Sequence, residues 1–292
     1  MNILFTGGGT GGHLVIALSL AEAAASRGHR VMFIGSTSGQ DRQWFEHSTV
    51  FEETHFLDTT GVVNKKGLGK LGAVWKILKA IVESRRLIRA FQTDAVVSVG
   101  GFSAAPAALA AVTMKTPLYI HEQNAVTGSL NRLLRPYANR FFSSYEEGEN
   151  HCDYPVSSVY FENARVRDRV KTVIFLGGSQ GAKFINDLAL GIAPWLESGG
   201  IHIIHQCGAK DEERVKSAYR ELGIEAEVYG FTTEIASLIA RSDFAVSRSG
   251  ASTLWELCAA QVPTFYIPFP HAAGDHQYHN ASNREVSHAV GA

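Results

Sequence analysis

Cysteine is scarce in this sequence, and its few cysteines form no recognisable pattern. The 292-residue chain contains Cys152, Cys207 and Cys258, with no Cys-x-x-Cys pair. Disulfide frameworks use even numbers of cysteines, and zinc sites use closely spaced pairs. We therefore expect buried or free thiols in a reducing compartment, and neither a disulfide-stabilised domain nor a zinc centre.

Long apolar runs and an excess of charge are missing as well. No segment reaches the roughly 18 uninterrupted apolar residues of a membrane-spanning helix, and the first residues lack the charged start and apolar stretch of a signal peptide. Lys and Arg number 27 against 28 Asp and Glu, for a net charge of -1. This balance disfavours a protein-wide surface for nucleic acid. We expect a cytoplasmic protein without a nucleic-acid partner.

Short apolar runs alternate with helical patterns in both halves of the chain. The first half predicts a helix at 12–27 and strands at 2–6, 30–34, 95–99, 118–121 and 140–143. The second half predicts strands at 172–176, 201–205, 225–229, 244–247 and 264–267, with helices at 182–196, 211–222, 233–240 and 251–260. This alternation is typical of α/β domains whose parallel sheet is covered on both faces. We predict two Rossmann-like, doubly wound domains, 1–155 and 165–292, joined near 150–168 and facing a cleft at the carboxyl ends of their strands.

Glycine clusters stand where predicted strands end and helices begin. Gly-Gly-Gly-Thr-Gly-Gly-His occupies 7–13, Gly-Gly-Ser-Gln-Gly-Ala occupies 177–182, and a third cluster, Ser-Val-Gly-Gly-Phe-Ser, occupies 98–103. Glycine lets a ligand approach the backbone, and a helix start presents N–H groups and a positive dipole end to an anion. One such loop could be a tight turn without a ligand. Two in matched positions predict an anionic or polar ligand.

The first loop does not complete either of two common nucleotide motifs. Gly7, Gly9 and Gly12 match the Gly-x-Gly-x-x-Gly pattern of dinucleotide-binding folds, but the acid expected after the second strand is replaced by Ile-Gly-Ser-Thr at 34–37. No Gly-Lys-Ser/Thr follows, which excludes a P-loop. An NAD-dependent oxidoreductase is therefore a disfavoured alternative.

Six blocks of the chain resemble the MurG family, the bacterial undecaprenyldiphospho-muramoylpentapeptide N-acetylglucosaminyltransferases. In that family's order they lie at 8–13, 100–106, 121–124, 177–182, 247–253 and 275–281. The resemblance implies a GT-B fold and inverting transfer of N-acetylglucosamine from UDP-GlcNAc to lipid I (undecaprenyl-diphospho-MurNAc-pentapeptide). The product, lipid II, serves peptidoglycan synthesis and hence cell shape and division. On this reading, 1–155 takes the acceptor and 165–292 takes UDP-GlcNAc.

Inverting transfer needs a base for the acceptor hydroxyl, and His13 is the best candidate. It stands where the first glycine loop enters its helix, and imidazole titrates near neutral pH. Alternatively, His13 binds an acceptor phosphate or caps the loop. Glu122 and Asn124, at the end of a strand, are the other catalytic candidates, which orient the acceptor or the sugar. Their alternative is a polar strand end that is hydrogen-bonded to a neighbouring loop.

The departing UDP needs positive potential, and the sequence offers no Asp-x-Asp motif for a metal ion. His271, Asp275, His276 and His279 could be drawn as a metal cluster, but we expect backbone N–H groups at 179–182 and 249–252 to hold the diphosphate. We therefore predict no metal and no cofactor.

The resemblance also implies a set of substrate-binding residues. Glu256 suits the ribose hydroxyls and Gln277 the sugar hydroxyls, while Arg165 or Arg167 replaces the family's linker arginine. Backbone groups near 231–232 would recognise uracil. The full predicted set is Thr10, Gly11, Gly12, Gly101, Asn124, Asn131, Arg165, Ser179, Gln180, Gly181, Thr232, Arg248, Ser249, Ala251, Ser252, Thr253, Leu254, Trp255, Glu256, Gln277 and Asn280.

A basic amphipathic segment spans 65–89. It contains eight Lys and Arg against Glu83, interleaved with apolar residues at helical spacing such as Val74, Trp75, Leu78 and Val82. Such a segment suits the anionic inner face of the cell membrane. The alternative is a helix that packs its apolar face on the domain and keeps its charges in water.

Two other functions remain open at this stage. A UDP-GlcNAc 2-epimerase would share the fold and the donor. A non-catalytic or truncated UDP-sugar-binding homologue is the second possibility, because members of the resembled family usually continue further beyond the position of Gln277 than this sequence, which ends at Ala292.

Overall fold

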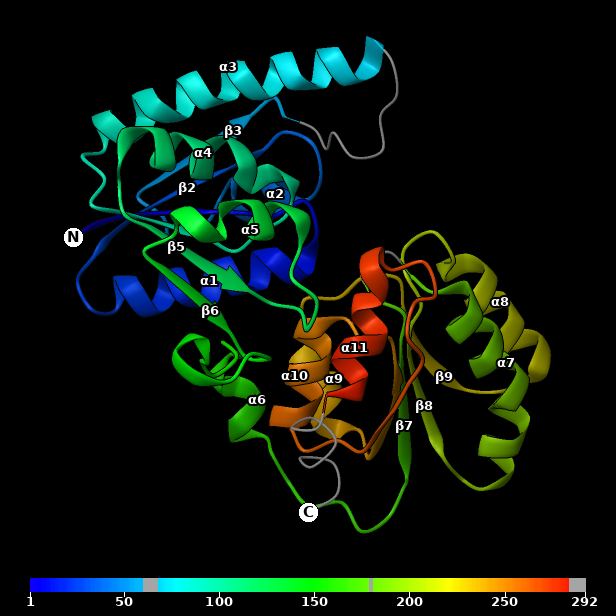
Figure 1. Ribbon diagram of the computed structural model, residues 1–292. Coiled ribbons are helices and arrows are strands. Elements are labelled where there is room, and N and C mark those ends of the chain that lie inside the picture. Colours follow the sequence, from blue (N-terminus) through cyan, green and yellow to red (C-terminus); the bar gives the residue numbers. More distant parts are fainter. Residues whose placement is uncertain (60–67, 179–180, 284–292) are drawn as a thin grey trace. The chain divides into compact units, whose positions relative to one another are not determined.

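A computed structural model describes residues 1–59, 68–178 and 181–283 of the chain (Figure 1). The chain divides into two compact units, Met1–Pro155 and Val156–Ala292. We describe each unit by itself. Within the described residues, no helix is both long and apolar enough to cross a membrane.

The first unit is built on a six-stranded parallel sheet. Its strand order, β3-β2-β1-β4-β5-β6, is that of a Rossmann fold, with the glycine loop on the central strand. The strands are β1 (Asn2–Thr6), β2 (Arg30–Ser36), β3 (Glu53–Leu57), β4 (Ala95–Ser98), β5 (Leu118–Glu122) and β6 (Arg140–Ser143).

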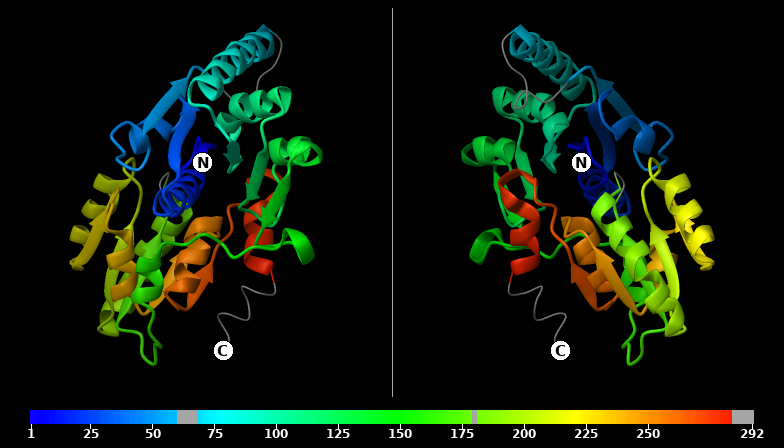
Figure 2. Two further views of the ribbon diagram at one scale, coloured as in Figure 1. Left: turned by 90° about the vertical axis from the view of Figure 1, so that its left-hand side faces the viewer. Right: turned by 90° about the vertical axis from the view of Figure 1, so that its right-hand side faces the viewer.

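Helices cover both faces of this sheet (Figure 1). They are α1 (Gly11–Ala25), α2 (Asp41–Phe45), α3 (Leu68–Ala90), α4 (Ala105–Met114) and α5 (Ser129–Leu134), with short 3-10 turns at Phe102–Ala104, Arg135–Tyr137 and Gly148–Asn150. Four buried alanines of α4 join the strand residues Leu4, Val96 and Ile120 in one core. Their small side chains let α3 lie along α4 (Figure 2).

The second unit holds a five-stranded parallel sheet in the order β11-β10-β7-β8-β9. Its strands are β7 (Thr172–Leu176), β8 (His202–Gln206), β9 (Ala226–Tyr229), β10 (Phe244–Ser247) and β11 (Thr264–Tyr266). Its helices are α6 (Ser158–Glu162), α7 (Lys183–Ser198), α8 (Glu212–Leu222), α9 (Ile235–Arg241), α10 (Ala251–Ala259) and α11 (His276–Ser282), with a 3-10 turn at Ala273–Asp275.

Two apolar cores lie on opposite sides of this second sheet. Ile185, Ala189 and Val215 from α7 and α8 form one, together with Phe175 of the central strand. Leu238, Ile239 and Leu257 from α9 and α10 form the other, with alternate strand residues such as Ile174. The sheet is therefore buried on both faces, which explains why its strands read as continuous apolar runs.

The predicted α/β class is confirmed, and each predicted strand coincides with an observed one to within one or two residues at its ends. Several elements were given no range from the sequence, among them β3, α6 and the helices α2, α4 and α5. The edge strand β3 is half-exposed and mixes polar with apolar residues, so it gives no buried apolar run. The short helix α6 lies inside the segment 150–168, which was expected to be an irregular linker.

Candidate active site

The loops after β1 and β4 pack backbone against backbone. The Gly8 N–H donates to the Gly100 carbonyl oxygen at 3.2 Å. A β-carbon on Gly101 would collide with the Gly8 carbonyl oxygen, and one on Gly7 would lie 2.6 Å from the Gly100 oxygen. Gly101 also adopts a φ of +79°, which favours glycine. The first and third glycine clusters of the sequence therefore form one surface.

Thr10 and His13 stand together where this surface meets α1. Thr10 is extended and precedes the helix, which begins with Gly11 and Gly12. The Thr10 hydroxyl lies 3.0 Å from His13 Nδ1. If His13 donates the Nδ1 proton to Thr10, the lone pair of the imidazole is on Nε2, which is the tautomer that a base at Nε2 requires.

Glu122 holds the loop that follows β5. It is almost fully buried. Its Oε1 accepts the Asn124 N–H at 3.0 Å, and its Oε2 accepts the Gly128 N–H and the Asn131 side-chain Nδ2, each at 2.9 Å. The carboxylate is thus engaged within the protein. The structure gives Glu122 the role of a polar strand end bonded to its neighbouring loop, and it brings Asn124 and Asn131 together around it.

His121 is a buried imidazole that sequence reasoning left out of the candidate set. Among the described residues, neither of its ring nitrogens has a hydrogen-bond partner. Its ring meets Tyr154 edge-on, with 6.0 Å between centroids. Burial, and then the nearby His13, lower the pKa of His121 to about 4. His121 is therefore a neutral polar group beside the candidate base. Only its place in the block 121–124 hinted at a role.

Asp41 was also missed. It is an acid close behind 34–37, the segment in which the dinucleotide motif would have an acidic residue. It lies five residues after the end of β2, at the start of α2, and is fully buried. Both of its carboxylate oxygens accept backbone N–H groups, from Gly9 and from Ser36. The carboxylate faces the glycine loop and not a ribose, so it does not revive the dinucleotide interpretation.

In the second unit, the loop after β7 packs on the end of β8. The Gly177 N–H donates to the Gln206 carbonyl oxygen at 2.9 Å. A β-carbon on Gly181, which has a φ of +75°, would lie 2.7 Å from the Cys207 oxygen. The predicted residues Ser179 and Gln180 lie outside the described residues. Gly181 itself leads directly into α7.

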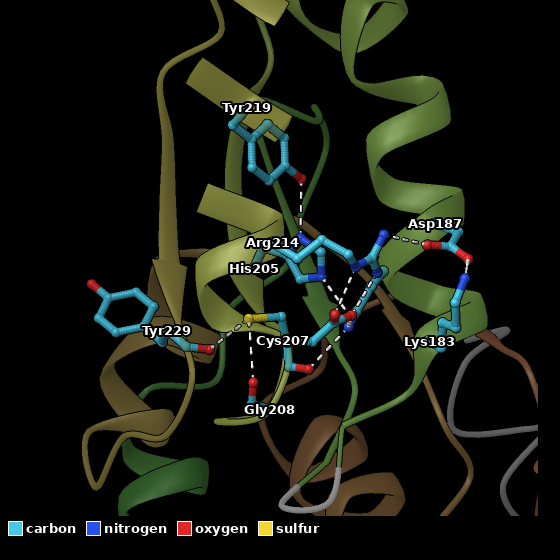
Figure 3. Close-up of polar contacts among 10 residues, drawn as sticks. Lys183, Asp187, His205, Cys207, Gly208, Arg214, Tyr219 and Tyr229 are labelled. Atoms are coloured by element: carbon cyan, nitrogen blue, oxygen red, sulfur yellow. Dashed lines mark hydrogen bonds and ion pairs between the residues drawn. The ribbon is translucent and has the colours of Figure 1, made fainter. Parts of the chain in front are cut away.

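A buried histidine lies in a hydrogen-bond network beside this loop (Figure 3). His205 Nε2 lies 3.0 Å from Asn186 Oδ1, and its Nδ1 lies 3.1 Å from the Tyr219 hydroxyl. Asn186 in turn donates from Nδ2 to the Cys207 carbonyl oxygen at 3.0 Å. With the Asn186 amide oriented in this way, His205 donates from Nε2 and accepts from Tyr219. Burial lowers the pKa of His205 to about 4, which keeps it neutral.

Ion pairs tie α7 to α8 on the outer side of the same network (Figure 3). Arg214 bonds Asp211 through Nε at 2.6 Å and Asp187 through Nη1 at 2.8 Å, and Lys183 also pairs with Asp187. The Arg214 hydrogen bond is the main reason that the pKa of Asp211 falls to about 2. The N-terminal turns of both helices are thereby fixed beside Gly181.

The loop after β10 is bonded to α11, so several predicted residues do come together. The Ser249 hydroxyl donates to the Gln277 carbonyl oxygen at 2.7 Å, and the Asn280 Nδ2 donates to the Ser249 carbonyl oxygen at 3.2 Å. Gln277 Oε1 accepts the Phe269 N–H at 2.9 Å. The block at 275–281 is therefore part of the same carboxyl edge as the loop at 247–253.

Arg248 is hydrogen-bonded to backbone groups in the same region. Its guanidinium donates from Nη1 to the carbonyl oxygens of Ile267 and Pro268, at 2.9 and 3.0 Å. Burial lowers the pKa of Arg248, although a guanidinium stays charged at neutral pH. Arg248 thus brings one positive charge to the β10 loop without an acidic partner in these contacts.

Helix α10 begins with a run of predicted residues, one of which is buried in the core. Ala251, Ser252 and Thr253 form its first turn and Trp255 follows. The predicted contact at Leu254 is not supported, because its side chain is fully buried in the core and its N–H donates to the Gly250 carbonyl oxygen.

Thr232 lies on the loop after β9. Its hydroxyl accepts the Glu234 N–H at 3.0 Å. The side chain is therefore engaged in its own turn, and uracil recognition here would depend on backbone groups.

Glu256 is buried on α10 and bonded to the Tyr160 hydroxyl of α6. Burial raises the pKa of Glu256 from 4.5 to about 7, and the Tyr160 hydrogen bond lowers it in part. A solvent-facing helix residue, the alternative to a binding role, would not show this burial. The carboxyl group therefore carries a proton for part of the time near neutral pH.

Both units of the chain match known protein families. Residues 3–143 match the glycosyltransferase family 28 N-terminal domain, and residues 172–291 match the C-terminal domain of that family. A crystal structure of Acinetobacter baumannii MurG aligns over 97% of this chain and 82% of that chain, with a TM-score of 0.73 and 28% sequence identity. The chain belongs to the MurG family of glycosyltransferase family 28. This confirms the resemblance and the GT-B fold that it implied.

Two curated MurG-family relatives show how far the similarity extends. Both are named UDP-N-acetylglucosamine--N-acetylmuramyl-(pentapeptide) pyrophosphoryl-undecaprenol N-acetylglucosamine transferase. The one from Sulfurimonas denitrificans is 60% identical over 96% of this chain and 83% of the relative. The one from Campylobacter jejuni subsp. jejuni serotype O:6 is 48% identical over 96% of this chain and 82% of the relative.

A more distant structure shares the fold with the MurG family. The UDP-GlcNAc 2-epimerase from Neisseria meningitidis, solved bound to UDP-GlcNAc, aligns over 90% of this chain and 81% of that chain with a TM-score of 0.60 and 12% identity. At that identity the likeness shows the fold alone, so the epimerase interpretation gains nothing from it.

The arginines predicted to make the MurG-family linker contact, Arg165 and Arg167, instead bond within the second unit. Arg165 bonds Asp243, which precedes β10, and Arg167 donates to the Ser242 and Ala260 carbonyl oxygens. Asp243 also accepts N–H groups at the start of β7. These contacts place both arginines at the amino ends of the strands, on the edge of the sheet opposite to the glycine loop. They brace the fold there, away from the carboxyl edge that carries the glycine loop.

The suggested histidine cluster does not form a metal centre in the part of the MurG-family chain that the structure describes. Within the described ranges, no group of three or more His, Cys, Asp and Glu side chains is placed to hold a metal ion. His276 instead contacts the Ala273 carbonyl oxygen.

We predict that Glu256→Gln raises the unfolding free energy of this MurG-family protein, relative to the wild type, by more at about pH 8 than at about pH 5. Because the folded-state pKa of about 7 lies above the ordinary value of 4.5, ionising Glu256 weakens the fold as pH rises through 7. The difference in unfolding free energy should reach about 3 kcal/mol. Urea unfolding of both proteins at the two pH values measures it. The exposed Glu197→Gln is the control, and an equal difference at both pH values would contradict the prediction.

Proposed function

We propose that this chain transfers N-acetylglucosamine from UDP-GlcNAc to lipid I with inversion, forming lipid II. One observation carries the proposal: relatives that are 48 to 60% identical over 96% of the chain bear the name of this N-acetylglucosamine transferase. The glycine loops, His13 and the α10 loop add a site of the expected chemistry. The product would serve peptidoglycan synthesis, and through it cell shape and division.

The first unit takes the acceptor in this proposal. The paired glycine loops offer a surface without side chains, beside the first turn of α1, which suits a lipid-linked diphosphate. His13 Nε2 removes the proton from the acceptor hydroxyl, and the resulting oxygen nucleophile attacks the anomeric carbon of the donor sugar. Asn124 and Asn131, held by Glu122, orient the acceptor. Glu122 then acts by positioning and not as a base.

The second unit takes the donor. As the new glycosidic bond forms, the bond to the UDP oxygen breaks and UDP leaves with both electrons. The N-terminal turns of α7 and α10 and the guanidinium of Arg248 stabilise the negative charge that develops on the diphosphate. Glu256 accepts hydrogen bonds from the ribose hydroxyls and Gln277 binds the sugar. Asn280 is fully buried and holds the Ser249 carbonyl oxygen, so it supports this loop from within the protein.

The acceptor is a lipid, and the outer face of α3 suits a membrane surface. Val74, Trp75, Leu78 and Val82 are all exposed, whereas Ala73 and other small side chains of the helix are buried. Ile81, Leu87 and Ile88 of the same helix pack on the core of the unit, so α3 buries one apolar face and exposes a second. With the basic residues along the same helix, this supports peripheral binding to anionic lipid on the cytoplasmic face of the membrane.

We predict that His13→Ala lowers kcat about 10²- to 10⁴-fold, because a placed general base contributes on that scale. Radiolabelled UDP-GlcNAc and a lipid I analogue measure transfer, with the exposed His47→Ala as the control. Unchanged turnover in His13→Ala would rule out His13 as the base. Labelled UDP-ManNAc from the wild type would mean an epimerase, and donor binding without turnover would mean a binding protein.

We predict that the double variant Trp75→Ser, Val82→Ser binds anionic phosphatidylglycerol vesicles at least about tenfold more weakly, because it removes apolar area that would enter the lipid interface. Cosedimentation with vesicles measures the loss. Trp195→Ser is the matched control, since Trp195 is 70% exposed on α7 of the other unit, compared with 60% for Trp75. Equal losses in the two variants would argue against a lipid-binding face on α3.

A further inference from the structure

A buried carboxylate joins the ends of two neighbouring strands in the first unit. Asp41 Oδ1 accepts the Gly9 N–H at 2.5 Å, and Asp41 Oδ2 accepts the Ser36 N–H at 2.8 Å. Gly9 follows β1 and Ser36 ends β2. Because Asp41 is fully buried, both bonds lie in a low-dielectric interior where a charged acceptor binds N–H groups strongly.

Two glycines beside Asp41 leave the space that its carboxylate occupies. A β-carbon at Gly8 would lie 2.6 Å from Asp41 Oδ1, and one at Gly35 would lie 2.9 Å from Oδ2. Gly8 does not have a positive φ. Its backbone conformation is therefore open to any residue, and the Asp41 side chain is what demands a glycine there.

The carboxylate also fixes the path of the chain into α1. The Gly8 N–H is bonded to Gly100 and the Gly9 N–H to Asp41. These two amides are used inside the protein. The next residue is Thr10, whose hydroxyl contacts His13. A shift of Gly9 would therefore move Thr10 and, with it, the orientation of the imidazole.

We propose that Asp41 is a positioning residue for the transfer reaction, which locks the Gly9 peptide so that Thr10 and His13 meet the acceptor in one geometry. The inference rests on the proposed function. Asp41 touches no substrate and acts through the loop. Its loss should weaken use of the acceptor, which the first unit binds in this proposal, and leave use of the donor intact.

The test is the isosteric Asp41→Asn variant in the full chain. An amide keeps one acceptor oxygen but turns an NH₂ group toward one of the two backbone N–H groups, so one bond is lost. We expect kcat/KM for a lipid I analogue to fall about 10- to 100-fold, as for other misplacements of about 1 Å. The KM for UDP-GlcNAc should stay within about twofold of the wild type.

Hydrogen exchange provides a readout that needs no turnover. Backbone amides in a peptide spanning 7–13 should exchange about tenfold faster in Asp41→Ala, because the Gly9 N–H then has no buried carboxylate to accept it. Glu46→Gln, at the exposed residue that follows α2, is the matched control and should change neither exchange nor kinetics. If the peptide exchanges as in the wild type, Asp41 does not lock the loop and the inference fails.

A second variant keeps the inference testable if Asp41→Asn does not fold. Gly8→Ala keeps the carboxylate but inserts a methyl group against it, and it should impair acceptor use in the same way. In an Asp41→Ala background the methyl group has room, so Gly8→Ala should cost little more there. Additive losses would overturn the coupling between the two residues.

The outcomes separate this inference from the proposed function. Transfer by the wild type together with unchanged acceptor kinetics in Asp41→Asn and Gly8→Ala overturns the positioning role alone. Equal losses for donor and acceptor, in step with a lower melting temperature, would show a merely structural residue and also overturn it. Absence of transfer in the wild type would overturn the proposed function.

Discussion

At the carboxyl edge of the first sheet, the loops after β1 and β4 approach each other so closely that no side chain fits between them. The Gly8 N–H bonds the Gly100 oxygen, and Gly101 has no room for a β-carbon. Everything proposed for the acceptor depends on this approach, because it fixes where α1 begins and hence where Thr10 and His13 lie. The cost of so many glycines is entropic, and the bonds to neighbouring groups offset it.

Two buried carboxylates organise this edge through the N–H groups that they accept. Asp41 accepts backbone N–H groups from the β1 and β2 ends, and Glu122 accepts them from the loop after β5. A carboxylate aimed at backbone amides gives a rigid loop, whereas one aimed at the ligand would repel a diphosphate. Keeping both acids turned inward therefore leaves the outer surface of the edge to N–H groups and to the imidazole of His13.

The fold was predictable from the sequence because its strands are buried on both faces and read as apolar runs. The exception, β3, is an edge strand and carries no such signal. The glycine loops were predictable because strand, glycine and helix follow in order. The buried residues that hold these loops in place were not predictable. Asp41 and His205 are buried and bond to residues of other elements, such as Gly9 and Asn186, while His121 is distinguished by its burial alone. No local pattern in the sequence encodes these properties. Arg165 was misplaced for the same reason, since its partner Asp243 lies at the opposite end of the strands.

Each unit also carries a buried neutral histidine near its glycine loop. The pKa values of His121 and His205 are both lowered to about 4, chiefly by burial. Neither ring gains charge between pH 5 and 9, so neither adds positive potential for a phosphate in that range. In the proposed function, helix ends and Arg248 supply the positive potential for the diphosphate instead. Glu256, whose pKa is raised to about 7 by burial, makes its unit sensitive to pH in a range where the buried histidines do not change charge.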